Sequence, residues 1–286
     1  MARIAYVNGR YVSIDTPAVA IEDRGYQFAD GIYEVCKVVR GRFCDLERHL
    51  DRLERSLDAM GMPMPMSRRA LALVMEETWR RNALPDAVIY LQVSRGTAPR
   101  NHAFGASMRP SLVVTVRAAK FPSGAELEKG VGVISLPDER WANCHIKSIS
   151  LLPNILAKQQ AAKAGCREAW LLDEQGRVTE GSSSNAWIVD GEGRLVTRPL
   201  GREILGGITR SVVIELAKRD GIEVVERAFT LEEAKAAREA FLTSTTSLVL
   251  PVTAIDGTPV ANGHPGSVTR RLAELYAEAE GMATAA

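Results

Sequence analysis

The pattern of apolar and polar residues predicts that the first part of the chain combines helices with a mainly antiparallel sheet. Residues 31–40 alternate in part and are rich in β-branched side chains, as expected of a strand that ends at Gly41-Arg42. Leucines then recur at helical spacing until Gly61 and Pro63, which predicts a helix; they are Leu46, Leu50, Leu53 and Leu57. A second helix is predicted around Leu71, Val74 and Trp79, with further strands at 87–94 and 111–117.

The same pattern predicts a second unit after a short linker. Residues 118–124 combine small residues with a proline and a glycine, which is typical of a linker. We therefore expect an N-terminal α/β domain over 1–117 and a C-terminal α/β domain over 125–286, with a frayed tail at 281–286. In the second domain, strands are predicted at 131–135, 168–172, 184–189, 194–197 and 240–243, and helices at 152–164, 208–219 and 266–280. The expected fold class is α+β or α/β.

Composition is that of a globular protein and excludes several functions. Of the 286 residues, 46% are hydrophobic and 25% are charged, so the chain can bury a core. The net charge of +1 argues against nucleic acid as a partner. No apolar run approaches the roughly 20 residues of a membrane span, and the first six residues lack the apolar stretch of a secretory signal. The cysteines are not spaced as metal or redox pairs, so we expect free thiols, no metal site and a cytoplasmic protein; they are Cys36, Cys44, Cys144 and Cys166.

Lys147 and Glu180 offer the two groups that pyridoxal 5′-phosphate (PLP) chemistry requires. The lysine stands within residues 144–148, just after a β-type run, and the carboxylate leads into the small hydroxylated residues of 179–185. A lysine amine can form a Schiff base with the PLP aldehyde, and a carboxylate can keep the ring nitrogen protonated so that the ring accepts electrons. Taken alone, Lys147 would be interpreted as a surface charge, because lysine is rarely buried.

Three other features could hold a phosphate. Gly206-Gly207 lies directly before a predicted helix, and helix N-termini with glycines bind anions. The hydroxyl cluster 243–247 follows a predicted strand, and Arg52 lies on the first predicted helix. Each also has an ordinary interpretation: a loop capped by Thr209, a loop of satisfied hydroxyls, and a solvated arginine.

Together these segments resemble the fold-type IV, class IV PLP-dependent aminotransferases, and within them the D-amino-acid aminotransferases. The matching stretches follow the family's order over nearly the whole chain. They are Glu22-Asp23-Arg24-Gly25-Tyr26-Gln27-Phe28-Ala29-Asp30-Gly31, Arg95 to His102, Ile146-Lys147-Ser148, Leu156-Ala157-Lys158-Gln159, Thr179 to Asn185, Gly207-Ile208-Thr209-Arg210 and Thr243 to Ser247. Each stretch is modest alone, but their combination is specific.

The resemblance implies a cofactor site and an assembly. Lys147 would hold PLP and shuttle the proton, and Glu180 would pair with the pyridine nitrogen. The phosphate would be held by Arg52, the backbone of Ile208 and Thr209, and Thr245. The family's fold consists of two mixed α/β domains with the cofactor in the interdomain cleft, and the active unit is a homodimer.

The resemblance also implies a substrate site. Tyr33, Arg100 and His102 would form a trap for the substrate α-carboxylate, because an arginine with two neutral donors suits a carboxylate. The residues that match Arg100 and His102 reach in from the neighbouring subunit in D-amino-acid aminotransferases. Ser183, with Val35 and Lys37, could line the side-chain pocket. Lys37 is either a further cation near the trap or a solvated strand residue.

The function that follows from the resemblance is transfer of the amino group of a D-amino acid, such as D-alanine, to 2-oxoglutarate or pyruvate by a ping-pong mechanism. Alternatives with the same fold are a branched-chain L-aminotransferase, an (R)-amine transaminase and 4-amino-4-deoxychorismate lyase. A non-catalytic PLP carrier and a purely structural α/β protein are alternatives of a different kind. The resemblance implies that the pairing of Arg100 with His102 favours D-substrates.

Overall fold

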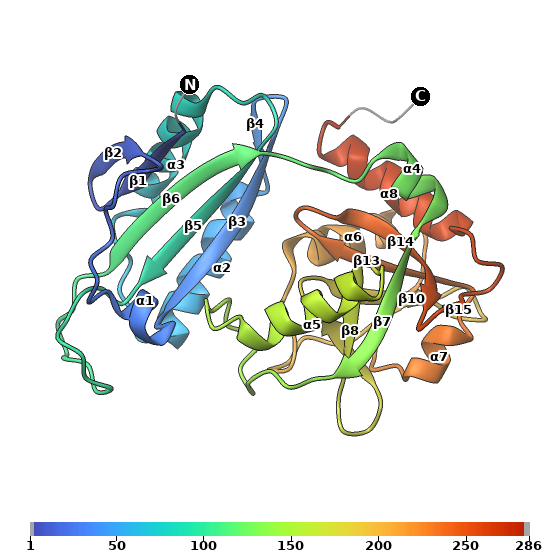
Figure 1. Cartoon of the computed structure of the whole chain (residues 1–286). Helices are drawn as coiled ribbons and strands as arrows, with labels where there is room; N and C mark the ends of the chain where they lie inside the picture. The colour runs from blue at the N-terminus through green and yellow to red at the C-terminus, as the bar shows by residue number, and fades with distance from the viewer. Residues whose placement is uncertain (1–2, 283–286) are drawn as a thin grey trace. The chain divides into compact units, whose positions relative to one another are not determined.

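The computed structural model describes residues 3–282 and divides into two compact units, each built on its own sheet (Figure 1). One unit contains the described residues up to Ala119 together with Ile146–Ser150. The other contains Lys120–His145 and the described residues from Leu151 onward. The chain thus leaves the first unit within the expected linker 118–124, but the short segment around Lys147 groups with the first unit. Residues 283–286 of the expected frayed tail lie outside the described part.

The first unit has a six-stranded antiparallel sheet with the order β2-β1-β6-β5-β3-β4. Three strands confirm the sequence-based prediction: β3 (Gly31–Val39), β5 (Ala87–Ser94) and β6 (Ser111–Ala118). Three short strands were not predicted, because four or fewer residues carry little periodicity; they are β1 (Ile4–Val7), β2 (Arg10–Ser13) and β4 (Arg42–Cys44).

Helices α2 (Leu46–Ala59) and α3 (Arg68–Asn82) cover one face of this sheet (Figure 1). Both were predicted, and the leucines of α2 are buried among the apolar residues of β3, β5 and β6. A five-residue helix, α1 (Arg24–Phe28), precedes β3 and ends at Ala29 in a left-handed conformation. Because side chains alternate along a strand, Glu34 faces α2 while Tyr33 points to the opposite face.

The second unit has a nine-stranded mixed sheet with the order β12-β11-β10-β13-β14-β7-β8-β9, and β15 pairs with β14. The predicted strands are confirmed as β7 (Val131–Pro137), β8 (Glu168–Leu172), β10 (Asn185–Val189), β11 (Leu195–Thr197) and β13 (Glu239–Ser244). The strands that were not predicted are β9 (Val178–Gly181), β12 (Val224–Glu226), β14 (Leu248–Ile255) and β15 (Thr258–Pro259). Of these, β14 is long and central, but it is largely a continuous apolar run, so its side chains show no polar–apolar alternation. It also contains Pro251, and proline is uncommon in the interior of a central strand.

Helices lie against this second sheet. The three predicted ones are α5 (Leu152–Lys163), α6 (Ile208–Arg219) and α8 (Ser267–Ala279), and two short ones are α4 (Gly124–Lys129) and α7 (Leu231–Lys235). Helices α6 and α8 pack on β13 and on each other, and bury the stacked rings of Trp187 and Phe241. Within residues 3–282, no helix combines the length and the apolar character needed to cross a membrane.

Candidate active site

Lys147 lies in an irregular segment, and the β-type run expected before it does not form a strand. Its carbonyl accepts a hydrogen bond from the Tyr33 N–H on β3 (2.9 Å), and its own N–H donates to Ser56 Oγ on α2 (3.3 Å). Its Nζ lies 4.2 Å from the centre of the Tyr33 ring. The side chain is half-exposed. The strand and the helix thus place the lysine at the edge of the first sheet, with its amine over an aromatic face.

Arg52 is not a solvated helix residue, because it is buried against Glu34. Its Nε and Nη2 donate to the two oxygens of that carboxylate at 2.7 and 2.8 Å. His49, one turn earlier on α2, contacts Glu34 Oε2 through Nδ1 at 2.8 Å. Arg52 therefore has a fixed orientation, which suits a guanidinium that is expected to meet a phosphate.

Glu34, His49 and Arg52 shift one another's pKa values. Burial alone would raise the pKa of Glu34, but the charge and hydrogen bonds of Arg52 and those of His49 hold it well below its usual range. Burial lowers the pKa of His49, and the contact with Glu34 offsets this only in part. The pair of Glu34 and Arg52 is therefore ionised, and His49 favours the neutral imidazole.

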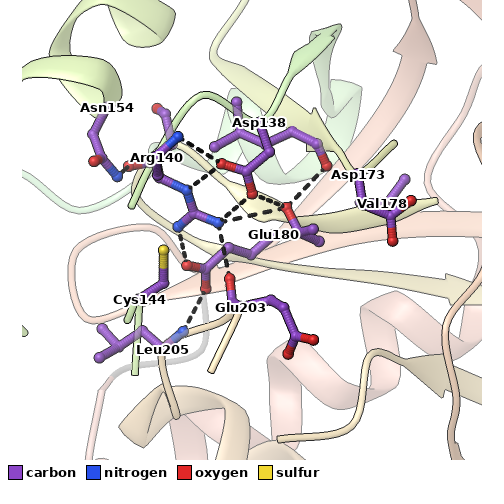
Figure 2. Close-up of polar contacts among 12 residues, drawn as sticks. Asp138, Arg140, Cys144, Asn154, Asp173, Val178, Glu180, Glu203 and Leu205 are labelled. Carbon is purple, nitrogen blue, oxygen red and sulfur yellow. Dashed lines mark hydrogen bonds and ion pairs between the residues drawn. The ribbon is translucent and has the colours of Figure 1, made fainter. Parts of the chain in front are cut away.

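Glu180 lies on β9 at the centre of a buried polar network (Figure 2). Its Oε1 accepts a short hydrogen bond from Arg140 Nη1. Its Oε2 accepts from the Leu205 N–H and from Asn185 Nδ2, both at 3.0 Å. Arg140 also donates to both oxygens of Asp138, at 2.9 and 2.7 Å. Because both oxygens of Glu180 accept hydrogen bonds, its carboxylate cannot rotate and its direction is fixed.

One guanidinium serves two carboxylates in this network, and the two titrate differently. Burial raises the pKa of Glu180 to about 7, although Arg140 and the Leu205 N–H favour its ionised form. Burial acts in the same sense on Asp138, but the hydrogen bonds from Arg140 bring its pKa below its usual range. When Asp138, Arg140 and Glu180 are all ionised, the group carries one excess negative charge. A protonated ring nitrogen would neutralise that charge.

Asn185 connects Glu180 to the start of α6. Its Nδ2 donates to the Leu205 carbonyl (2.9 Å) as well as to Glu180. A Cβ on Gly207 would overlap Asn185 Oδ1, so any other residue at that position would have to displace the asparagine side chain. Gly207 is the N-cap of α6 and provides no side chain to occupy the first N–H groups of the helix. The candidate ring and phosphate positions are therefore joined through one asparagine.

The other residues expected at the phosphate lie at the same end of the second unit. Ile208 and Thr209 form the first turn of α6 and are buried. Asn185 pairs with Thr243 on β13, and Thr245 follows two residues later in the turn before β14. The backbone N–H groups at the start of α6 and the hydroxyls after β13 are the donors that a phosphate requires.

Ser183 is exposed, and its hydroxyl donates to Glu168 Oε2 at 2.7 Å. Glu168 is buried on β8 and also accepts from Ser182 and Ser184. The serines that follow Glu180 are thus held by a second carboxylate, which the sequence analysis did not identify.

The three residues expected to bind the substrate carboxylate have different neighbours within the first unit. The Tyr33 ring stacks on Tyr90 with centroids 5.6 Å apart. Arg100 and His102 are exposed in the loop 95–110 and pack on the Phe28 ring, at 4.6 and 5.4 Å. Lys37, for which a solvated position was one alternative, is 2% exposed, so that alternative is wrong.

Several residues that shape the site were not found from the sequence. Asp138 and Arg140 lie within five residues of the end of the predicted strand 131–135, and this position near a strand end is the only sign of their role. Glu34 and His49 were passed over because a charged residue within a strand or a helix is usually solvated. Among residues 3–282, no three His, Cys, Asp or Glu side chains form a group that could hold a metal ion.

Comparison with known proteins shows the family. Residues 31–255 match the model of Amino-transferase class IV, so the chain belongs to that family. It is 40% identical to D-alanine aminotransferase of Bacillus licheniformis over 93% of both chains. It is also 40% identical to D-alanine aminotransferase of Listeria monocytogenes over 95% of this chain and 94% of the relative.

Among solved structures, a branched-chain aminotransferase of Thermoproteus uzoniensis with norvaline matches with a TM-score of 0.89 and 28% identity, over 98% of this chain and 96% of that one. The branched-chain amino acid aminotransferase of Escherichia coli matches with a TM-score of 0.87 and 26% identity, over 95% and 92%. The fold is therefore that of the class IV aminotransferases, as the sequence predicted.

Proposed function

We propose that the protein is a PLP-dependent D-amino-acid transaminase. It would move the amino group of a D-amino acid such as D-alanine to a 2-oxo acid, either 2-oxoglutarate or pyruvate. The observation that carries the proposal is the 40% identity to D-alanine aminotransferases over more than nine-tenths of the chain. The residues that PLP chemistry requires are present and oriented, which supports the cofactor.

The donor set fits PLP. When Glu180 is ionised, the buried network of Asp138, Arg140 and Glu180 has one excess negative charge, which suits a protonated ring nitrogen. The glycine-capped start of α6, Thr245 and the oriented guanidinium of Arg52 suit a phosphate. When bound, PLP supplies an aldehyde for Lys147 and a ring that takes up the electron pair released at the substrate Cα.

In this proposal each group of the protein has a defined task. The Lys147 amine removes the proton from the substrate Cα, and returns a proton in the second half-reaction. Glu180 keeps the ring nitrogen protonated, and Arg140 keeps Glu180 in place. Tyr33, Arg100 and His102 bind the α-carboxylate, and Ser183 lines the side-chain pocket. The substitution Lys147→Ala should abolish turnover and the absorbance of the lysine-bound cofactor.

The proposal includes a cytoplasmic homodimer. Exposed apolar side chains support a partner surface on each unit: Ile21 and Tyr26 on the first, and Leu152, Ile155 and Leu156 on the second. Contiguous apolar side chains on a surface often mark an interaction site. A second copy would also bring its own Arg100 and His102.

A branched-chain L-aminotransferase is the second candidate, because both solved structures quoted above are named branched-chain aminotransferases. One assay separates the two: a panel of D- and L-amino acids with 2-oxoglutarate or pyruvate as acceptor. The proposal expects D-alanine to react and L-leucine to be poor. Rapid turnover of L-leucine without D-alanine activity would contradict the D-specificity while leaving the PLP chemistry intact.

A further inference from the structure

We propose that Arg24 is a positioning residue for substrate recognition, because it fixes the backbone of the loop that carries Arg100 and His102. The inference rests on the proposed function for the role of those two side chains. The contacts that carry it lie entirely within the first unit.

The loop between β5 and β6 covers residues 95–110 and contains no helix or regular strand. It extends from the sheet beside α1 (Figure 1). Loops longer than about 12–15 residues without secondary structure are usually either functional or disordered. Arg100, Asn101 and His102 are exposed near its tip. A binding role requires that something holds this backbone in one shape.

Arg24 binds the backbone of this loop and the Asp30 carboxylate with all three nitrogens of its guanidinium. Nη1 donates to the Asn101 carbonyl at 2.5 Å, and Nη2 donates to the His102 carbonyl at 3.1 Å. Nε donates to Asp30 Oδ2 at 2.8 Å. The Arg24 side chain is only 5% exposed, in contrast to the exposed loop that it binds. The planar fork of arginine holds two successive carbonyls in a fixed geometry through two separate nitrogens, whereas lysine offers one nitrogen with rotatable donors.

Asp30 makes the support rigid because, besides Arg24, it also binds Arg95 at the start of the loop. Arg95 Nε lies 2.9 Å from Asp30 Oδ2, and its Nη2 donates to the Met60 carbonyl at 2.9 Å. The Arg95 guanidinium also lies 3.7 Å from the centre of the Phe104 ring. The carboxylate of Asp30 thus joins the start of the loop to the arginine that holds its tip.

The backbone of the segment before β3 also binds the start of the loop. The Arg24 N–H donates to the Gly96 carbonyl at 2.9 Å, and the Ala98 N–H donates to the Glu22 carbonyl at 3.3 Å. Gly96 has φ +107°, and a Cβ there would overlap the Arg109 carbonyl, so the turn needs glycine. These contacts limit the loop to one path.

The polar groups of the two trap residues are left available. Over the described range 3–282, the side chains of Arg100 and His102 have neither a hydrogen bond nor an ion pair, and both rest on Phe28. Phe28 also stacks with Arg24, at 4.7 Å. The positions of the trap side chains therefore depend on the backbone and the ring that Arg24 contacts. A shift of about 1 Å in such a group can reduce a reaction rate about 100-fold.

The test is a double-mutant cycle on the full-length holoenzyme. Stopped-flow half-reactions with D-alanine alone give the apparent dissociation constant and the limiting rate for wild type, Arg24→Met, Arg100→Ala and the double variant. We expect Arg24→Met to weaken D-alanine binding at least about tenfold with a smaller change in the limiting rate. The double variant should lose less than the sum of the two single losses, because part of the effect of Arg24→Met acts through Arg100 and only the rest acts through His102.

Two further variants and one independent readout complete the design. Arg24→Lys keeps the charge beside Asp30 without the fork, so it should fold and show an intermediate defect. Arg68→Met removes an arginine of the same unit that pairs with Glu47 and Asp51 far from the loop in sequence, and should behave as wild type. Hydrogen exchange of the amides at 97–105 in the cofactor-free protein should quicken in both Arg24 variants and not in Arg68→Met.

The outcomes separate the inference from the proposed function. If Arg100→Ala impairs D-alanine binding but both Arg24 variants match wild type in binding and exchange, the positioning role is wrong. Additive effects in the cycle would also overturn it, because they would show a general loss of structure. If Arg100→Ala changes nothing, the carboxylate role in the proposed function fails, and the positioning role falls with it.

Discussion

Glu180 shares the single guanidinium of Arg140 with Asp138, and this shared charge decides how Glu180 titrates. Asp138 receives two hydrogen bonds from the Arg140 guanidinium, whereas Glu180 is buried and receives one. The fold therefore stabilises the ionised form of Asp138 more than that of Glu180. The bound cofactor would supply the missing positive charge.

At the residue scale, the pH dependence of stability tests the raised pKa of Glu180. The folded pKa of Glu180, about 7, lies above the value of an unfolded glutamate, so its contribution to stability is complete below pH about 4.3 and is lost as the pH rises through 7. In the cofactor-free protein, the free energy of unfolding should fall by on the order of 3 kcal/mol by pH 8.5. Urea unfolding of wild type and Glu180→Gln between pH 5 and 8.5 measures it.

In Glu180→Gln this part of the pH dependence should disappear. Glu203→Gln removes an exposed carboxylate close by and should retain it. Saturation with PLP should reduce the loss, because a protonated ring nitrogen favours ionised Glu180. Identical pH profiles for wild type and Glu180→Gln would contradict the raised pKa.

At the scale of elements, the start of α6 offers a matched pair of glycines. Gly207→Ala would push Asn185 away from Glu180 and from the Leu205 carbonyl, because the new Cβ overlaps Asn185 Oδ1. We expect the Kd for PLP to rise at least about tenfold, which corresponds to about 1.4 kcal/mol. Fluorescence titration of the cofactor-free protein with PLP measures it.

Gly206→Ala is the control, since a Cβ at that position meets only Leu200 Cδ2 at 3.6 Å. Its Kd should stay within about twofold of wild type, a change of less than 0.5 kcal/mol. Equal losses in both variants would mean that general flexibility of the segment, and not the contact with Asn185, governs binding.

Helix α2 connects the core of the first unit to the site, because it carries Leu53 on its buried face and Arg52 beside it. Leu53 is fully buried, so Leu53→Ala should cost 2–5 kcal/mol of unfolding free energy. Leu73→Ala, on the exposed side of α3, should change it by less than about 0.5 kcal/mol. Urea unfolding at one fixed protein concentration compares the two.

For the whole molecule, the proposed homodimer can be tested on α5. Leu152, Ile155 and Leu156 form one apolar stripe at spacings of three and four residues, and they are 66%, 59% and 54% exposed. If this stripe is covered by a second copy, Ile155→Glu should produce a monomer. Light scattering with size-exclusion chromatography at several concentrations measures the mass.

Leu73→Glu is the control for that experiment, because Leu73 is 57% exposed and lies on the other unit. It should leave the mass of the dimer unchanged. A dimer that survives glutamate at both Leu152 and Ile155 would show that its contact lies elsewhere.

Much of the fold could be predicted from the sequence because long elements repeat their pattern. The leucines of α2 recur at helical spacing and the residues of β3 alternate, so both were predicted within a few residues. The pattern gave no sign of β14, which is apolar throughout and contains Pro251, or of short strands such as β9. A strand that is buried on both faces has no polar side to mark its period.

The sequence by itself determined the family and the residue types of the candidate site, since Lys147, Glu180 and Arg100 stand in matching motifs that no folding is needed to recognise. Only the tertiary structure decided what surrounds them. Arg140 is 40 positions from Glu180, and Arg24 binds carbonyls 77 and 78 positions away. Such contacts depend on the packing of whole elements, which no local pattern of residues records.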